Sequence, residues 1–295
     1  MQLVTSPDSK FRTISDSKST YKGKSKEASF FSIVYNSMIV RLLIWRRYRA
    51  EAIGSFIQII ILTTVFFLFA TAVGFRGYAD FGTREIFIFF LGGFLVLVFD
   101  GVSIYGPVNA MQRELYNGTL EYLYFTPMKK YPYFLGYLIG SVIVNSLTGF
   151  VPAFLILIIY AQLSINNILL ILLTLSLLMI SLLSMGIIVS LMVILFKQVQ
   201  ALISLLGLAL EFFTGAFIPV SSLPSYIKPI SYIFPHTWAY QLIRYYSFNG
   251  NWPLIVPLAF NWLFLIGFTI LYTIIALVLQ KRVIKHAKEK GLHIL

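Results

Sequence analysis

The sequence contains no cysteine, and only 12% of its 295 residues are charged. The lack of cysteine excludes disulfides and thiol catalysis. A soluble domain carries about a quarter charged residues, so the low charge argues against a soluble protein. The three histidines are scattered without metal-ligand spacing, and we find no convincing Ser/His/Asp set. The phosphate-binding pattern GxxxxGK[ST] is also missing, so the chain is not by itself an ATPase of that type.

Apolar residues, by contrast, make up 58% of the chain, and several apolar runs exceed about 18 residues. This pattern predicts an all-α, polytopic membrane protein with six transmembrane helices. We expect a disordered cytoplasmic arm over 1–28, a single transmembrane domain over 29–285 and a cytoplasmic tail over 286–295. The six expected spans are Ala52–Phe75, Ile86–Gly106, Phe134–Tyr160, Ile168–Phe196, Ala201–Ile218 and Leu254–Gln280.

An additional helix is predicted before the first span, over Ser29–Arg49. Four arginines near its end are costly in hydrocarbon, so we expect it to lie in the cytoplasmic interface. A shortened first span is the alternative. In the third span, Gly136 and Gly140 form a GxxxG pair that permits close helix contact. The expected apolar face of the interfacial helix consists of Phe31, Tyr35, Met38, Leu42 and Trp45.

The segment between the fifth and sixth spans, Pro219–Pro253, is not a simple loop. It holds five prolines, with apolar and aromatic residues between them. This composition fits two short helices that dip into the outer leaflet as a re-entrant hairpin. Backbone at that depth needs protein around it.

The distribution of positive charge gives the orientation. With both termini in the cytoplasm, the inner segments hold 19 of the 23 lysines and arginines. The positive-inside rule therefore predicts a multi-pass protein of the cell membrane with both termini cytoplasmic. The net charge of +12 reflects contact with anionic lipid rather than with nucleic acid. The outer segments hold only Arg76, Arg84, Lys228 and Arg244.

The cytoplasmic loop after the second span contains a short amphipathic helix. Gly118 ends the preceding structure, Glu121 falls in the first turn of the new helix, and Pro127 stops it. Leu120 and Leu123 belong to one apolar stripe. The helix is either a surface loop that lies on lipid headgroups or a docking element for a soluble partner.

These segments resemble the membrane subunit of a type-2 ABC exporter, a family of permeases for drugs, polysaccharides and lipid-linked glycans. The resemblance covers roughly 29–285. One departure is Gln112, where many members carry an acidic residue. The motifs that carry the resemblance are Arg113-Glu114, Gly118-Thr119-Leu120-Glu121, Thr126-Pro127, Thr214-Gly215-Ala216-Phe217-Ile218-Pro219, Leu223-Pro224 and Pro235-His236-Thr237-Trp238, with Arg244 beyond.

The resemblance implies that two permease subunits, here expected to be identical, pair with two nucleotide-binding ATPase subunits. ATP and Mg²⁺ would bind to those partners, and this chain would hold no cofactor and catalyse no reaction. The cargo would be an amphipathic or lipid-linked compound, moved outward. The residues expected to couple this chain to the ATPase are Arg113, Glu114, Gly118, Thr119, Leu120, Glu121 and Leu123.

Polar residues within the spans are candidates for the translocation path, because such groups are costly in lipid. They are Glu211, Asp100, Thr214 and Asn145. Glu211 either contacts cargo, takes a proton or pairs structurally, and for Asp100 a structural role is favoured. The candidates for an outer gate are Phe217, Pro219, Pro235, His236 and Trp238, with His236 expected to be a hydrogen-bonding core residue rather than a metal ligand.

Two other functions stay open. A proton-coupled secondary transporter would use Glu211 or Asp100, although the two halves of the chain show no convincing repeat. A membrane-embedded enzyme that modifies lipids would need clustered carboxylates or histidines at one depth, and the sequence offers isolated ones.

Overall fold

The computed structural model describes residues 29–72, 82–104, 106, 130–195 and 200–289. The described residues are helical apart from short turns, and contain no strand. The prediction of an all-α protein is therefore confirmed for this part of the chain. In chain order the helices are α1 (Phe30–Arg47), α2 (Arg49–Ala72), α3 (Thr83–Ser103), α6 (Lys130–Asn145), η1 (Ser146–Phe150), α7 (Val151–Ala161), α8 (Ile165–Leu195), α9 (Gln200–Phe213), η2 (Val220–Ser222), α10 (Lys228–Ile233), α11 (Pro235–Ser247) and α12 (Leu258–Glu289).

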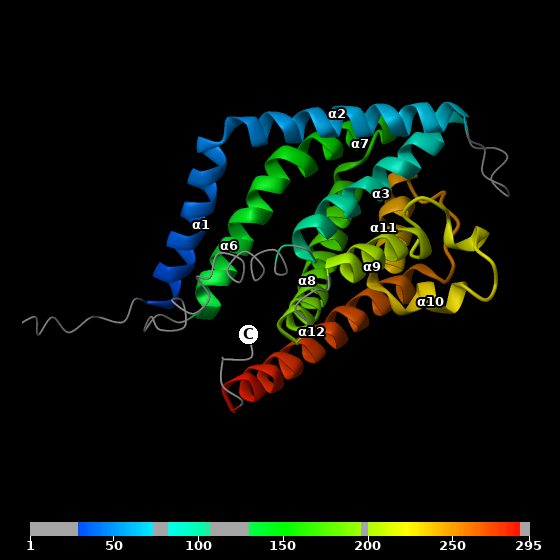
Figure 1. The fold of residues 1–295 in the computed structure, drawn as a ribbon. Coiled ribbons are helices and arrows are strands. Elements are labelled where there is room, and N and C mark those ends of the chain that lie inside the picture. Colours follow the sequence, from blue (N-terminus) through cyan, green and yellow to red (C-terminus); the bar gives the residue numbers. More distant parts are fainter. Residues whose placement is uncertain (1–28, 73–81, 105, 107–129, 196–199, 290–295) are drawn as a thin grey trace, which may run out of the picture.

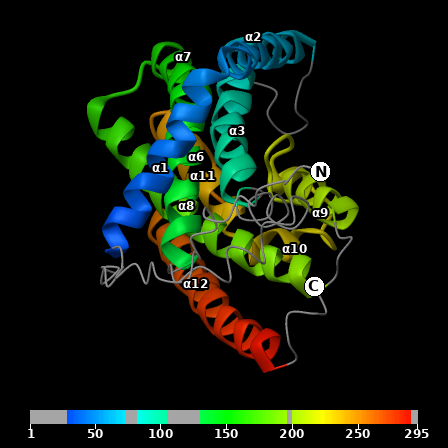
Figure 2. The same ribbon diagram turned by 60° about the vertical axis from the view of Figure 1, so that its left-hand side comes forward.

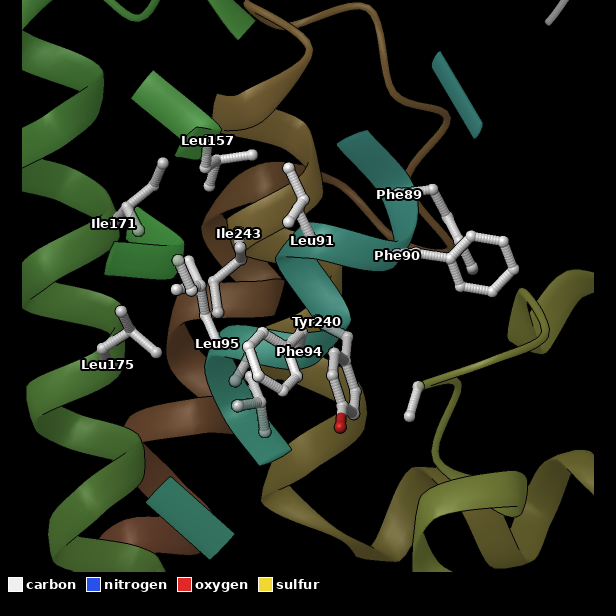
Figure 3. Close-up of a cluster of buried hydrophobic side chains, with 14 of the residues drawn as sticks. Phe89, Phe90, Leu91, Phe94, Leu95, Leu157, Ile171, Leu175, Tyr240 and Ile243 are labelled. Atoms are coloured by element: carbon white, nitrogen blue, oxygen red, sulfur yellow. The ribbon is translucent and has the colours of Figure 1, made fainter. Parts of the chain in front are cut away.

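Helices α3 and α11 form the centre of the molecule. Every residue of α11 except Tyr245 is buried, and α3 is buried without interruption from Ile86 to Val96. A helix that is apolar all round must be enclosed, and α3 packs against α2, α7, α8 and α11. Figure 3 shows α3 side chains such as Leu91 and Leu95 between α8 and α11. This pair of helices positions the candidate site.

The other helices surround this centre. Helix α12 runs along α8, α6 runs along α1, and α2 crosses one end of the molecule, as Figures 1 and 2 both show. Helices α2 and α12 leave most of their apolar side chains exposed, which fits contact with lipid or with a second membrane chain.

Four helical stretches of the described chain are long and apolar enough to cross a membrane. They correspond to the first, third, fourth and sixth expected spans, while the count of six stays a prediction. Helix α3 occupies the place of the second expected span. The four stretches are Ile53–Ala72, Leu135–Ala161, Ile165–Leu191 and Leu258–Arg282.

The fifth expected span ends earlier than predicted. The described part of α9 has 14 residues, about 21 Å, and ends at Phe213 instead of Ile218. The helix ends at Phe213 because Gly215 adopts φ +103°, a left-handed conformation that closes helices. The two short helices predicted after it are present as α10 and α11, while their re-entrant position in a membrane stays a prediction.

The GxxxG pair contacts α1. A Cβ on Gly136 would meet the backbone carbonyl of Val34, and one on Gly140 would lie 2.9 Å from the Cβ of Arg41. The predicted close contact at these glycines is therefore confirmed, and Arg41 adds a 3.3 Å hydrogen bond from Nε to Ser141 Oγ. The interfacial position of α1 stays a prediction.

The predicted apolar face of α1 is a different face from the one that packs on α6. Phe31 and Tyr35 are 80% and 58% exposed, whereas Ile33 is buried and Val34 faces Gly136. A glycine face needs a partner whose backbone can come close, and bulky aromatic side chains prevent that approach. Phe31 and Tyr35 therefore point away from α6.

The third expected span changes its helix type in the middle. Ser146–Phe150 form a π-helical turn between α6 and α7, directly before Pro152. Proline has no N–H for the α-helical ladder, and its ring clashes with the carbonyl four residues earlier. The wider turn accommodates this break while the span continues to Ala161.

Candidate functional site

Arg244 is the largest fully buried side chain of the described molecule. Its guanidinium carbon lies 3.5 Å from the centre of the Phe89 ring, and its Nη2 donates a 2.9 Å hydrogen bond to the carbonyl of Ala216. The aromatic rings of Tyr240 and Trp252 lie within 5.7 Å of the same carbon. A desolvated guanidinium is stabilised by aromatic faces and by carbonyl acceptors. Arg244 thus joins α3, α11 and the turn after α9.

Two glycines allow this junction to close. A Cβ on Gly93 would lie 2.7 Å from the Ala216 carbonyl oxygen and 3.5 Å from Nη2 of Arg244. Gly215 supplies the left-handed turn that presents Ala216, and its own Cβ would lie 2.9 Å from Val220. Only glycine therefore fits at both positions without displacement of the backbone or its neighbours.

The helices α9, α10 and α11 are tied together through Ser231. Its hydroxyl donates a 2.6 Å hydrogen bond to the carbonyl of Phe213, the last residue of α9. The carbonyl of Ser231 accepts a 2.6 Å hydrogen bond from the Thr237 hydroxyl on α11. Ser231 and Thr237 are completely buried. The hairpin is therefore anchored on the C-terminal end of α9.

Asp100 and His236 form a buried pair between the end of α3 and the beginning of α11. His236 Nε2 lies 3.1 Å from Asp100 Oδ1, and the two side chains are 1% and 8% exposed. With Nε2 protonated, the imidazole donates this bond to the carboxylate. The expectation that His236 is a hydrogen-bonding core residue is thereby met. The distance between the two residues along the chain is 136 positions.

The pairings show that α3 and α11 run antiparallel. Arg244 contacts Phe89 near the beginning of α3, whereas His236 contacts Asp100 near its end. The beginning of α3 lies at the same end of the molecule as Tyr160, whose carbonyl accepts two hydrogen bonds from Arg84. His236 therefore lies beside Asp100, at the opposite end of α3 from Arg84, and its role in an outer gate stays a prediction.

Glu211 on α9 lies close to this pair. It is half-buried near the C-terminal end of α9 and within electrostatic range of Asp100 and His236. Tyr240, one turn after His236 on α11, is in electrostatic range of Asp100 and Glu211. Its hydroxyl is buried and has no hydrogen-bond partner among the described residues. We call Asp100, Glu211, His236 and Tyr240 the acidic cluster.

The other candidates for the translocation path and the outer gate lie in two regions of the structure, on α6 and around α9 to α11. Asn145 lies at the end of α6, outside the hydrogen bonds of the acidic cluster, and donates a 2.9 Å hydrogen bond to the Ser141 carbonyl in its own helix. The remaining five lie around the turn after α9 and along α11. They are Thr214, bonded to the Leu210 carbonyl, Phe217, packed on Phe212, Pro219, Pro235, and Trp238, stacked on Phe264 at 4.4 Å.

The predicted coupling residues, Arg113, Glu114, Gly118, Thr119, Leu120, Glu121 and Leu123, lie outside the described residues. In the part of the chain that the structure describes, no group of three His, Asp or Glu side chains is placed to hold a metal ion.

Sequence reasoning missed Arg244 as a site residue and counted it among the charges of an outer loop. It also missed Tyr240, Phe89 and Gly93. One signal was present, because an arginine in an otherwise apolar and aromatic segment needs a buried partner. Which partner it finds depends on the antiparallel packing of α3 and α11, and the sequence does not contain that information.

The chain was compared with known proteins. A family model described as ABC-2 type transporter matches residues 29–248, which is more than half of the chain. A comparison with curated proteins found no match. The matched region runs from α1 to the end of α11 and contains the whole acidic cluster and Arg244. The resemblance to a type-2 ABC permease is thereby confirmed.

Proposed function

Because the chain belongs to the ABC-2 type transporter family, we propose that it is the permease subunit of an ABC exporter that moves an amphipathic or lipid-linked compound outward. The observation that carries this proposal is the family match over α1 to α11. Four apolar helices of membrane-spanning length support it. The chain then provides the path, and ATP hydrolysis takes place on another subunit.

The sequence supports a separate ATPase subunit in this proposal. The chain has no GxxxxGK[ST] pattern, so ATP and Mg²⁺ belong to a partner subunit. The segment Gln112–Pro127 is the proposed contact with that partner. Arg113, Glu114 and Glu121 fix its register through charge, while Leu120 and Leu123 fill an apolar groove.

A second copy of the permease completes the proposed transporter. Many large apolar side chains on α2, α9 and α12 are exposed because no other part of the described chain packs on them. This exposed apolar surface supports a partner within the membrane. Both termini lie in the cytoplasm in this proposal. The contact between Arg84 and Tyr160 is consistent with that topology, because it brings together the two ends expected outside.

The test begins with affinity purification of the permease from its native membranes, which should recover a nucleotide-binding ATPase. The two proteins are then reconstituted together. In proteoliposomes, Glu121→Lys should leave ATP hydrolysis measurable and reduce transport by at least about tenfold, because the reversed charge disrupts the register of the contact. Asp16→Lys, the same charge reversal in the N-terminal arm, is the matched control and should transport normally. Unchanged transport by Glu121→Lys would contradict the coupling role.

A proton-coupled carrier is the second candidate, and the buried Asp100–His236 pair beside Glu211 is the observation that favours it. The two functions differ in their energy source. Transport by the proposed exporter requires ATP and persists when a protonophore collapses the proton gradient. A carrier shows the opposite dependence.

A further inference from the structure

We infer that the acidic cluster binds the cationic group of a lipophilic organic cation, and that such cations are the cargo class of this permease. This inference rests on the proposed function and concerns the same membrane domain. It depends on four observations: the charge of the cluster, its unused hydrogen-bonding capacity, its exposure and its apolar surroundings.

The charge of the cluster favours a cation. Asp100 and Glu211 lie within electrostatic range of each other, and His236 is the group within hydrogen-bond distance of Asp100. The nearby positive charge is the guanidinium of Arg244, which lies 5.1 Å from the Tyr240 ring and is engaged by Phe89 and by the Ala216 carbonyl. Counted with a neutral imidazole, two carboxylates and one guanidinium leave one negative charge at the cluster, which favours a cationic ligand.

Tyr240 provides an independent indication of a ligand. Its side chain is 1% exposed, and its hydroxyl has no hydrogen-bond partner among the described residues. Figure 3 shows this hydroxyl directed away from the labelled leucine and isoleucine side chains, and it is within electrostatic range of Asp100 and Glu211. A buried hydroxyl without a partner is costly, so its presence beside two carboxylates indicates that the positive group of a ligand lies against the hydroxyl oxygen.

The residues of the cluster differ in their exposure to the surface. Asp100 and His236 are buried, whereas Glu211 on α9 is only half-buried. Helix α9 packs mainly on α10, so much of its surface is uncovered by the rest of the described chain. A ligand can therefore reach Glu211 from the uncovered face of α9.

The surroundings of Glu211 are apolar and aromatic. Leu208, three residues before it and thus on the same helix face, and Phe212 are exposed, and Phe217 packs against Phe212 with ring centres 5.3 Å apart. Such a surface binds the hydrocarbon part of a ligand, and the aromatic faces favour a diffuse positive charge. Metal ions fit poorly, since no three acidic or histidine side chains of the described chain converge on one point. Together these features select a large organic cation.

The experiment uses the full-length chain in lipid nanodiscs without any ATPase. The probe is radiolabelled tetraphenylphosphonium, and the competitor is tetraphenylborate, an anion of the same shape and size. We expect saturable binding of the cation above that of empty nanodiscs, with no displacement by the anion. Binding that never saturates, or equal displacement by the anion, would overturn the inference without any variant.

Variants then locate the site. Glu211→Gln removes the charge with little change in shape, and we expect it to weaken binding by about tenfold or more. Glu211→Asp keeps the charge and should bind within about threefold of the native protein. Glu85→Gln, which alters a carboxylate at the far end of α3, is the matched control and should bind normally. Tyr240→Phe should weaken binding less than Glu211→Gln does.

Unfolding followed by tryptophan fluorescence shows whether each variant keeps its structure. Native-like binding by folded Glu211→Gln contradicts the assignment of the site. Because the assay contains no ATPase, its failure leaves the proposed exporter function intact. Conversely, failure to recover an ATPase partner leaves the binding result intact.

Discussion

Replacing Gly93 with alanine adds a single methyl group at the point where α3 meets the turn after α9. The new Cβ would lie 2.7 Å from the carbonyl oxygen of Ala216, which is closer than carbon and oxygen atoms can approach. The turn must therefore move by a few tenths of an ångström, and with it the acceptor of the Arg244 hydrogen bond.

The expected magnitude combines three effects. In a helix, alanine is favoured over glycine by up to about 1 kcal/mol. Overpacking of a closed interior costs about 1–3 kcal/mol. A hydrogen bond to a charged donor contributes about 1.5–3 kcal/mol, part of which is lost when the carbonyl moves away from Arg244. We expect Gly93→Ala to lower the free energy of unfolding by about 1–3 kcal/mol.

Gly267→Ala is the matched control, because a Cβ at Gly267 in α12 would meet no atom within 4 Å. It should leave stability unchanged or raise it by up to about 1 kcal/mol. Both variants are measured by unfolding in detergent with tryptophan fluorescence as the signal. Trp252, whose ring centre lies 5.7 Å from the guanidinium carbon of Arg244, reports on the affected region directly.

A double-mutant cycle with Arg244→Lys tests the physical reason. Lysine keeps the charge and cannot place a planar guanidinium on the Phe89 ring. Since both substitutions act through the Ala216 carbonyl, their effects should depart from additivity by about 0.5–3 kcal/mol. If Gly93→Ala proves as stable as Gly267→Ala, or if the cycle is additive, the proposed junction at Ala216 is refuted.

Two further predictions concern other contacts. Gly136→Val should destabilise the protein by about 1–3 kcal/mol in the same unfolding assay, because its side chain meets the α1 backbone, whereas Gly54→Ala has open space and should be neutral; equal stability of the two variants would contradict the close contact of α1 and α6. His236→Phe should cost about 3–5 kcal/mol, because it leaves the buried carboxylate of Asp100 without its imidazole partner. Adding Asp100→Leu to His236→Phe should restore part of that stability, and a further loss of similar size would show that the pair is not coupled.

The sequence predicted much of the helical framework. Long apolar runs determine where the helices α2, α8 and α12 lie, because length and hydropathy are local properties. The close contact of Gly136 was also predictable from the GxxxG spacing. The early end of α9 depends on the left-handed conformation of Gly215, and a glycine alone does not reveal its backbone angle.

Features that depend on tertiary packing were beyond sequence reasoning. Helix α1 meets the glycines of α6 through Val34, Ser37 and Arg41, and the amphipathic pattern of α1 does not reveal this contact. Asp100 and His236 are 136 residues apart, and no spacing rule pairs them. Arg244 was assigned to an outer loop because the positive-inside rule counts charges between spans along the sequence and contains no information on burial.

The antiparallel contact of α3 and α11 has a mechanical consequence. Helix α3 is about 32 Å long by helical rise, and the segment proposed to meet the ATPase follows it in the chain. It is joined to α11 at two levels, by Arg244 near one end and by the Asp100–His236 pair near the other. Two attachment points prevent one rod from pivoting on its neighbour. In the proposed exporter, a force applied to the end of α3 that precedes this segment would therefore move α11 together with α3 as one rigid unit.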